Sequence, residues 1–351
     1  MRVSIANSGR SFAVAPGRTL LDAALDAGLN LPHSCKGGSC GTCRARLLAG
    51  RVVYPNGVPL GLSDAEVAEG LILLCQARAQ GDISVETFEV GLADRVEIKR
   101  LPCRIERTER WSHDVMGVFL KLPAAERFEF EPGQYVDIML PKGGRRSFSI
   151  ASPPHDARLL ELHVRRVPGG GFTDRLFAQE ARGVLLTLEG PLGHFIYRAP
   201  GPNAEGARAR PMLLIGGGTG LAPLKSIIRH VVESGLPRDM ALYWGVRAER
   251  DLYAHGALEE LAGRSLRYVP VLSCPEPGWN GRRGYVHEAV LADFESLDDL
   301  EIYASGPPEM IEAIRREFPA RGMGLGQLSF DSFDYAPDST ARQRTRAETR
   351  S

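Results

Sequence analysis

Four of the six cysteines have the spacing of ligands to an iron–sulfur cluster. Cys35, Cys40 and Cys43 form a C-x4-C-x2-C run, and Cys75 follows further along the chain. Such a spacing serves [2Fe–2S] clusters, in which each iron takes two cysteine thiolates and two bridging sulfides. A zinc site or unrelated thiols are the alternatives, but structural zinc sites usually pair two C-x2-C units. The sequence therefore predicts a [2Fe–2S] cluster on these four thiolates.

Glycines in the same loop suit the cluster. Gly37, Gly38 and Gly41 allow a close wrap of the backbone and φ values that a β-carbon would resist. Hydrogen bonds from the loop to the sulfurs tune the reduction potential of such clusters. Cys103 and Cys274 lie apart, and we expect each to be a small buried residue. Over residues 1–91 the chain resembles the plant-type ferredoxin family, which implies a β-grasp fold.

A second motif follows an apolar strand pattern at 134–139. Arg146-Ser147-Phe148-Ser149 has the form R-x-[FY]-[ST], which resembles the flavin signature of the ferredoxin–NADP reductase superfamily. A flavin site needs an aromatic ring, a cation for phosphate and a hydroxyl near N5. The resemblance implies that Arg146 pairs with phosphate, Phe148 packs on the isoalloxazine, and Ser149 lies near N5 as a catalytic residue.

Two further stretches support the flavin. The glycines at 169–171 lead into a predicted helix start, where backbone N–H groups and Thr173 can bind phosphate. A flexible hairpin is the alternative interpretation of these glycines. The segment 189–193 resembles the turn that ends the flavin barrel of the superfamily, and FAD is favoured over FMN because a nucleotide domain follows. The candidate FAD contacts of this region are His163, Arg165, Gly170, Gly171, Phe172 and Thr173.

A glycine loop between an apolar strand and a helix predicts a pyrophosphate site. The run 216–223 places Leu221 where the G-x-G-x-x-G fingerprint has its last glycine, so it departs from that fingerprint. It resembles instead the G-x-G-T-G-x-A-P form of the reductase superfamily. Arg247, after the next strand, either bonds to a 2′-phosphate or lines the site; we expect NADH or NADPH and favour NADH. The candidate nucleotide contacts are Gly217, Gly218, Thr219, Gly220, Pro223 and Arg247.

Two stretches near the C-terminus complete the predicted site. Ser305 and Gly306 lie in a segment that resembles the C-G-x-x-x-M nicotinamide motif, with serine where cysteine is common. Phe333 resembles the terminal aromatic that covers the flavin, the alternative being a core phenylalanine on a last strand. We predict both Ser305 and Phe333 as catalytic and cofactor-binding residues, alongside Ser149.

The elements that must position these residues change character along the chain. Alternating strands and one short helix at 1–91 give way to short strands with Gly/Pro turns, and then to apolar strands alternating with helices. The predicted fold is therefore multidomain, α+β and α/β. It comprises a β-grasp ferredoxin domain, an FAD-binding β-barrel and a parallel α/β nucleotide domain. We place them at 1–91, 92–202 (with a linker) and 203–335, followed by a disordered tail at 336–351.

Composition excludes several classes of partner. With 43 basic and 43 acidic residues the formal net charge is zero, which argues against nucleic acid because phosphate binding requires a basic surplus. The apolar runs are too short to span a bilayer, and no export signal precedes the first strand pattern. We therefore expect a cytoplasmic protein that does not associate with a membrane. We also expect it to be a monomer.

The order of the three parts resembles the oxygenase reductases that carry an N-terminal ferredoxin. The reductase of 3,6-dideoxysugar synthesis is similar too. A nicotinamide gives two electrons and a cluster takes one, so flavin between them acts as a converter. No Rieske or di-iron ligand pattern occurs in the sequence, so we expect a separate electron acceptor, a terminal oxygenase component or another protein. A dehydratase partner, or a carrier or sensor with little turnover, remains the alternative.

Overall fold

The structure is a computed structural model of the chain. Three predicted site residues, Cys35, Cys40 and Gly170, lie outside the residues that it describes, as does the predicted tail at 336–351. The described residues are 1–33, 36–38, 41–59, 61–62, 64–87, 96–140, 144–156, 158–167, 171–178, 181–199, 210–263, 266–324 and 327–333.

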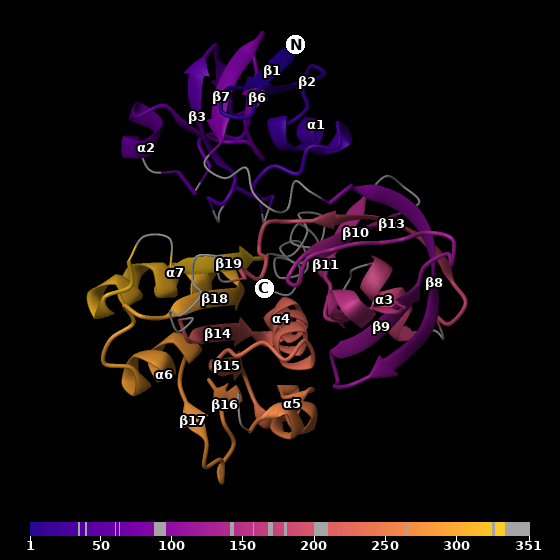
Figure 1. Cartoon of the computed structure of the whole chain (residues 1–351), viewed down its shortest axis with the longest axis vertical. Helices are drawn as coiled ribbons and strands as arrows, with labels where there is room; N and C mark the ends of the chain where they lie inside the picture. The colour runs from indigo at the N-terminus through magenta and orange to yellow at the C-terminus, as the bar shows by residue number, and fades with distance from the viewer. Residues whose placement is uncertain are drawn as a thin grey trace, which may run out of the picture. The chain divides into compact units, whose positions relative to one another are not determined.

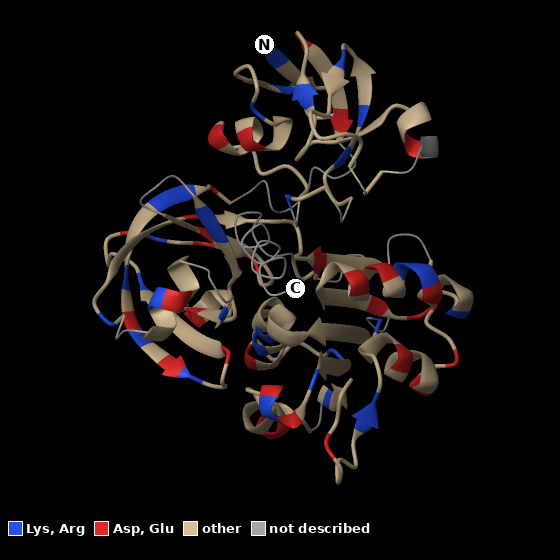
Figure 2. Ribbon diagram, turned by 180° about the vertical axis from the view of Figure 1, so that it is seen from behind, with Lys and Arg blue, Asp and Glu red and all other residues tan. Residues whose placement is uncertain are grey.

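Contacts divide the chain into two compact units. One unit comprises Met1–Lys99 with Gly190–Phe195, and the other comprises the described residues of Arg100–Glu189 and Ile196–Ser351. Acidic and basic residues are interspersed over the elements of both units, in keeping with the zero net charge (Figure 2). Within the described ranges, no helix has the length and apolar character needed to cross a membrane.

The first unit is built on a five-stranded sheet of order β2-β1-β7-β3-β5, in which β1 and β7 run parallel (Figure 1). Its first helix begins after Thr19, whose hydroxyl accepts a hydrogen bond from the Asp22 backbone N–H at 3.2 Å. This arrangement is the predicted β-grasp. The elements are β1 (Arg2–Ile5), β2 (Arg10–Ala13), α1 (Leu20–Asp26), β3 (Arg44–Ala49), β4 (Val52–Val53), α2 (Asp64–Ala68), β5 (Leu71–Leu73), β6 (Arg78–Ala79) and β7 (Ile83–Thr87).

The second unit starts with a six-stranded antiparallel sheet of order β11-β10-β13-β8-β9-β12. A bridge between Ile150 and Leu162 joins its two edge strands, so the sheet closes into the predicted barrel. The first strand begins at Lys99, inside the stretch expected as a linker, because Leu101 and Cys103 already point into the core. Cys103 is thus buried as expected, whereas Cys274, which we also expected to be buried, is exposed. The elements are β8 (Lys99–Arg110), β9 (Val115–Lys121), β10 (Tyr135–Met139), β11 (Arg145–Ser149), η2 (Pro154–Asp156), β12 (Leu160–Arg165), α3 (Gly171–Ala178) and β13 (Leu185–Leu192).

The rest of this unit is a six-stranded parallel sheet of order β17-β16-β15-β14-β18-β19. Helices α4 and α5 cover one face, and α6 and α7 cover the other (Figure 1). From β14 the chain adds β15, β16 and β17 on one side of the sheet, and it then adds β18 and β19 on the other side of β14. The strand order therefore reverses between β14 and β18, and such a switch point opens a crevice at the carboxyl ends of the strands. The strands are β14 (Met212–Gly217), β15 (Met240–Val246), β16 (Leu266–Leu272), β17 (Arg282–Arg283), β18 (Glu301–Gly306) and β19 (Leu328–Ser332). The helices are η4 (Gly218–Gly220), α4 (Leu221–Glu233), η5 (Glu249–Asp251), α5 (His255–Leu261), α6 (Val286–Asp293), α7 (Pro308–Glu317) and η6 (Phe318–Arg321).

Candidate functional site

Two of the four predicted cluster ligands lie at neighbouring strand ends. Cys43 precedes β3 and Cys75 follows β5, and these strands pair antiparallel. The Leu74 backbone N–H donates to the Cys43 carbonyl at 3.0 Å, which holds the two backbones together. Both cysteines are buried. The structure therefore brings these two thiols to one end of the sheet.

The loop that leads to Cys43 has the predicted left-handed backbone at two of its three glycines, whereas Gly37 is not among the residues with positive φ. Gly38 and Gly41 have φ values of 86° and 75°. A β-carbon on Gly38 would lie 2.8 Å from the Gln76 side chain, so a larger residue would displace the loop. The Thr42 hydroxyl oxygen is buried and has no hydrogen-bond partner among the residues that the structure describes. A [2Fe–2S] cluster fits this end of the sheet, which offers the two thiols, a tight glycine turn and the unpaired Thr42 hydroxyl.

The predicted flavin motif forms strand β11. Phe148 is half-buried, and its ring packs against that of Phe172 at a centroid distance of 6.0 Å. Ser147 faces away from this pair, and its hydroxyl donates to the buried Asp137 carboxylate at 2.5 Å. The Arg146 guanidinium donates to the Arg145 carbonyl at 2.7 Å.

Helix α3 begins where the glycine-rich stretch predicted. Gly171 is its first residue, and a β-carbon there would meet nothing within 4 Å. Thr173 lies in the first turn, and its hydroxyl accepts a hydrogen bond from the Val167 backbone N–H at 3.2 Å. The hydroxyl thus tethers the helix to the strand before it, a contact that the sequence did not predict.

The glycine loop folds as a strand, a single turn and a helix. Gly217 ends β14, η4 spans Thr219, and α4 starts at Leu221, so Pro223 occupies the first helical turn as expected. A β-carbon on Gly217 would lie 2.8 Å from the Pro307 ring, and one on Gly220 would collide with the Ser305 carbonyl. The loop therefore packs backbone to backbone on the end of β18.

Arg165 reaches the same loop from barrel strand β12. A β-carbon on Gly218, which has a φ of 56°, would lie 2.9 Å from the Arg165 guanidinium. The guanidinium also pairs with Asp114 at 3.2 Å. A fixed cation beside a glycine loop that leads into a helix is suited to a pyrophosphate.

The three predicted catalytic residues converge. The Ser149 hydroxyl on β11 donates to the Asp331 carboxylate on β19 at 3.4 Å. Asp331 is the register partner of Ser305 on β18. The Phe333 backbone N–H donates to the Gly306 carbonyl at 3.3 Å. Residues from three distant stretches thus meet where the barrel adjoins the carboxyl ends of the parallel strands.

Ser305 has a distinctive environment within this group. It is fully buried, and its hydroxyl oxygen has no hydrogen-bond partner in the described part of the chain. Buried polar groups are nearly always paired, so this hydroxyl is one of the few exceptions among the described residues. An unpaired hydroxyl, an adjacent glycine cradle, a half-buried aromatic ring and nearby cations fit a flavin and a nicotinamide nucleotide.

Two predicted contacts lie apart from this convergence. His163 is buried, and both ring nitrogens are already occupied, Nε2 by Glu161 at 2.9 Å and Nδ1 by the Tyr253 hydroxyl at 2.8 Å. Arg247 is exposed just beyond the end of β15. His163 as a cofactor contact and Arg247 as a nucleotide contact therefore stay predictions.

Sequence reasoning missed several polar residues around the site, notably Asp331, Glu161 and Lys225. Glu161 accepts hydrogen bonds from His163 and from the Lys225 ammonium, the latter at 2.5 Å. A signal was present, because Glu161, His163 and Arg165 alternate along a strand whose other residues are apolar. Such alternation places three polar side chains on one face.

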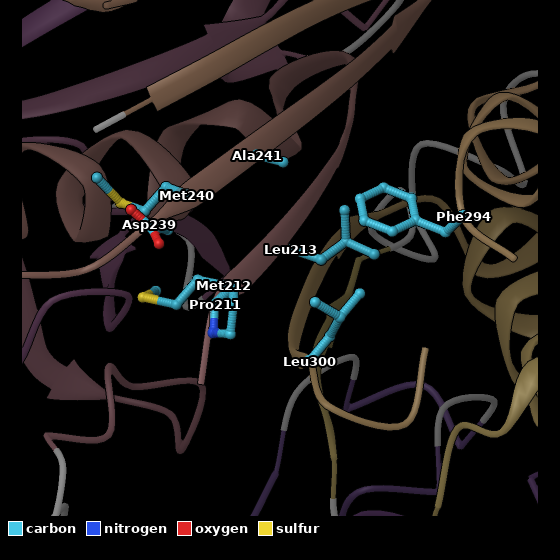
Figure 3. A pocket seen from close by; sticks show the side chains of 8 residues that line it. All are labelled: Pro211, Met212, Leu213, Asp239, Met240, Ala241, Phe294 and Leu300. Atoms are coloured by element: carbon cyan, nitrogen blue, oxygen red, sulfur yellow. The ribbon is translucent and has the colours of Figure 1, made fainter. Parts of the chain in front are cut away.

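A small apolar pocket lies at the other end of the strands of the parallel sheet. Met212 and Met240 are the first residues of β14 and β15, so the pocket is at the amino ends of the strands, away from the glycine loop. Figure 3 shows Leu213 beside Phe294 and Leu300 in its wall. Its lining comprises Pro211, Met212, Leu213, Asp239, Met240, Ala241, Phe294 and Leu300.

Three family descriptions match successive parts of the sequence. Residues 3–80 match the 2Fe-2S iron-sulfur cluster binding domain. Residues 102–197 match the oxidoreductase FAD-binding domain, and residues 214–316 match the oxidoreductase NAD-binding domain. The matches follow the order of the ferredoxin-like sheet, the barrel and the parallel sheet.

Relatives match over almost the whole chain. A reductase subunit of an aromatic O-demethylase from Amycolatopsis is 38% identical over 339 residues, covering 95% of this chain and 99% of that one. A CDP-6-deoxy-L-threo-D-glycero-4-hexulose-3-dehydrase reductase from Yersinia pestis is 34% identical over 334 residues, covering 95% and 98%. The crystal structure of the Amycolatopsis cytochrome P450 reductase GcoB superposes with a TM-score of 0.79 at 37% identity, covering 95% of this chain and 99% of that one.

Proposed function

The chain belongs to the family of reductases that join a 2Fe-2S ferredoxin domain to FAD-binding and NAD-binding oxidoreductase domains, and from this premise we propose a terminal oxygenase as its electron acceptor. The chain is an oxidoreductase that transfers electrons from NAD(P)H through FAD and a [2Fe–2S] cluster to a partner protein. Bound FAD supplies the conversion of a two-electron donor into single electrons.

One observation carries the assignment of the reactive site to particular residues. Ser149, Ser305 and Phe333 come from three distant stretches, yet they meet around Asp331 beside the glycine loop. In our proposal the Ser149 and Ser305 hydroxyls would contact the bound flavin and nicotinamide, and the Phe333 ring would pack on the flavin. Asp331 holds the Ser149 hydroxyl by a hydrogen bond.

The remaining side chains of the site bind the cofactors rather than react. We assign FAD to Arg146, Phe148 and the start of α3, where a cation, a half-buried ring and helix N–H groups are available. The nucleotide pyrophosphate is assigned to the loop at 217–220 with the Arg165 guanidinium beside it. Cys43 and Cys75, with Cys35 and Cys40, are assigned to the cluster.

A terminal oxygenase as the acceptor is supported by the relatives. Two matches from Amycolatopsis cover almost the whole chain, and they are named as the reductase subunit of an aromatic O-demethylase and as a cytochrome P450 reductase. A second acceptor, a sugar dehydrase, is supported by the Yersinia relative, which aligns over the same length at 34% identity. We further propose that the chain works as a monomer, which size-exclusion chromatography with light scattering tests.

Two assays test the proposed function. Anaerobic NADH or NADPH should bleach the flavin, and steady turnover with ferricyanide should follow; a carrier or sensor would turn over slowly. In an assay that adds a candidate acceptor protein, an oxygenase should consume O2 only in the presence of its substrate. Electron uptake by that acceptor without O2 would instead favour the dehydrase alternative.

A further inference from the structure

A polar chain of buried and half-buried side chains links the barrel to the nucleotide domain, and the site proposed above assigns none of its members to a bound cofactor. We call Glu161, His163, Lys225 and Tyr253 the Glu161 network. Glu161 and His163 lie on barrel strand β12, Lys225 lies on α4, and Tyr253 follows η5. The contacts run from Lys225 to Glu161 at 2.5 Å, Glu161 to His163 at 2.9 Å, and His163 to Tyr253 at 2.8 Å.

The donor and the acceptor of each hydrogen bond between Tyr253, His163 and Glu161 can be assigned. Burial lowers the pKa of His163, so its ring is neutral and carries a single N–H. That N–H, on Nε2, donates to the Glu161 carboxylate, which leaves Nδ1 to accept from the Tyr253 hydroxyl. Burial would raise the pKa of Glu161, but the hydrogen bond from His163 and the Lys225 ammonium outweigh it and keep the carboxylate ionised. Each member is thereby held in one orientation.

The far end of the network reaches the glycine loop. The Trp244 and Tyr253 rings pack edge to face, with their centroids 5.1 Å apart and their planes at 84°. The Trp244 indole N–H donates to the Gly218 carbonyl at 2.8 Å. Tyr253 also stacks on Trp111 of the barrel, with the ring centroids 5.8 Å apart and the planes 4° from parallel. Tyr253 therefore contacts both a barrel residue and the residue that holds the loop.

Further polar contacts attach α4 to the barrel along the same side of the helix. The Ser226 hydroxyl donates to the Ser152 carbonyl at 2.8 Å. One turn on, the Arg229 guanidinium pairs with Asp156 at 3.5 Å. Hydrogen bonds and ion pairs fix relative position more strictly than apolar contact does, because their energy depends on direction. Since α4 starts at the end of the glycine loop, the barrel sets the position of that loop.

We propose that the Glu161 network fixes the position of the glycine loop, and with it the position of the bound nicotinamide, relative to the flavin. The proposal rests on the proposed function, because it concerns the step in which NAD(P)H reduces FAD. Lys225, Glu161, His163 and Tyr253 act as positioning residues, since the loop and Trp244 stand between them and the bound nucleotide. A small displacement of the reacting groups lowers the rate constant by a large factor. A network that fixes the position of the loop therefore supports the reduction of FAD.

The test uses the holoenzyme and two variants on different elements. Tyr253→Phe removes one hydroxyl and retains the ring between Trp111 and Trp244, and Lys225→Met removes the ammonium on α4. Tyr243→Phe is the matched control, because its hydroxyl donates to Asp293 at 2.6 Å in the same domain without contacting the loop. FAD content and the melting temperature are measured for every variant.

Two readouts decide the proposal. Amide hydrogen exchange of the peptide covering 213–224 should rise in both network variants and stay at the wild-type rate in Tyr243→Phe. The rate constant of FAD reduction by saturating NADH or NADPH should fall on the order of tenfold in the network variants, with the FAD content unchanged. Electron transfer from dithionite-reduced enzyme to cytochrome c should not change, since it bypasses the nucleotide.

Wild-type exchange and wild-type FAD reduction in both network variants would overturn the proposal, and so would equal effects in Tyr243→Phe. Failure of the proposed function has a different signature. In that case the wild-type flavin itself would stay oxidised under NADH and NADPH, whatever the exchange data show.

Discussion

Ser305 places a buried hydroxyl at the junction of β18, β19 and the glycine loop. Among the described residues its oxygen has no hydrogen-bond partner, although the side chain is fully excluded from solvent. An unpaired buried hydroxyl costs about 1–3 kcal/mol of folding free energy. Retaining it makes physical sense if a bound ring system supplies the missing partner, as our proposed site assignment requires.

Ser305→Ala should therefore shift stability and activity in opposite directions. Without nucleotide, the free energy of unfolding should rise by about 1 kcal/mol, because the unpaired hydroxyl is removed. The rate constant of FAD reduction should fall at the same time. Denaturant unfolding and rapid-mixing absorbance measure the two quantities, with Ser305→Cys as the comparison that restores a polar atom. A loss of stability in the alanine variant would show that the hydroxyl has a partner in the folded protein.

His163 predicts a pH dependence of stability. Burial holds its pKa below the ordinary value of 6.5, so the unfolded chain binds a proton more readily than the folded one. Its stabilising contribution is complete above pH 6.5 and is lost as the pH falls through the folded-state value. Melting temperatures of wild type and His163→Gln between pH 8 and pH 5 check this. The wild type should lose more stability over that range than the variant; parallel curves would argue against it.

At the scale of elements, the glycine loop depends on close backbone contact with β18. A β-carbon on Gly220 would collide with the Ser305 carbonyl, and that atom belongs to a packed strand that cannot easily move. Gly256 in α5 is a useful contrast, since a β-carbon there meets nothing within 4 Å. The loop tolerates no side chain at Gly220, whereas the helix tolerates one at Gly256.

Gly220→Ala should separate the loop from β18 and suppress reduction of FAD by NADH and NADPH. Gly256→Ala should leave that rate unchanged and stabilise the helix by roughly 0.5–1 kcal/mol. Both variants are assayed by anaerobic reduction and by thermal unfolding. Normal reduction in Gly220→Ala would mean that the loop position is not needed for nucleotide binding.

Most elements could be predicted because their patterns are local. The strand pattern at 134–139 corresponds to β10, and the helix predicted after the glycine loop corresponds to α4. The Glu161 network could not be predicted in this way. Its members lie far apart in the chain, and only the packing of α4 on β12 brings Lys225 to Glu161.

At the scale of the whole molecule, our proposed site assignment puts the exit of electrons and their entry in different compact units. Cys43 and Cys75 belong to the unit formed by Met1–Lys99 and Gly190–Phe195, whereas Ser149, Ser305 and Phe333 belong to the other. Loss of a cluster ligand should therefore spare the folding of the barrel and nucleotide domain. The family matches and the full-length relatives agree with this division of roles.

The most direct measurement of the central claim is the reduction of cytochrome c and of ferricyanide by Cys75→Ser under saturating NADH or NADPH. We predict that the variant keeps its FAD and its ferricyanide activity, because the residues that we assign to the flavin lie in the other unit. Cytochrome c reduction and the cluster's visible absorbance should be lost together. Wild-type cytochrome c reduction by a variant that has lost its cluster would contradict the claim that electrons leave through the four cysteines.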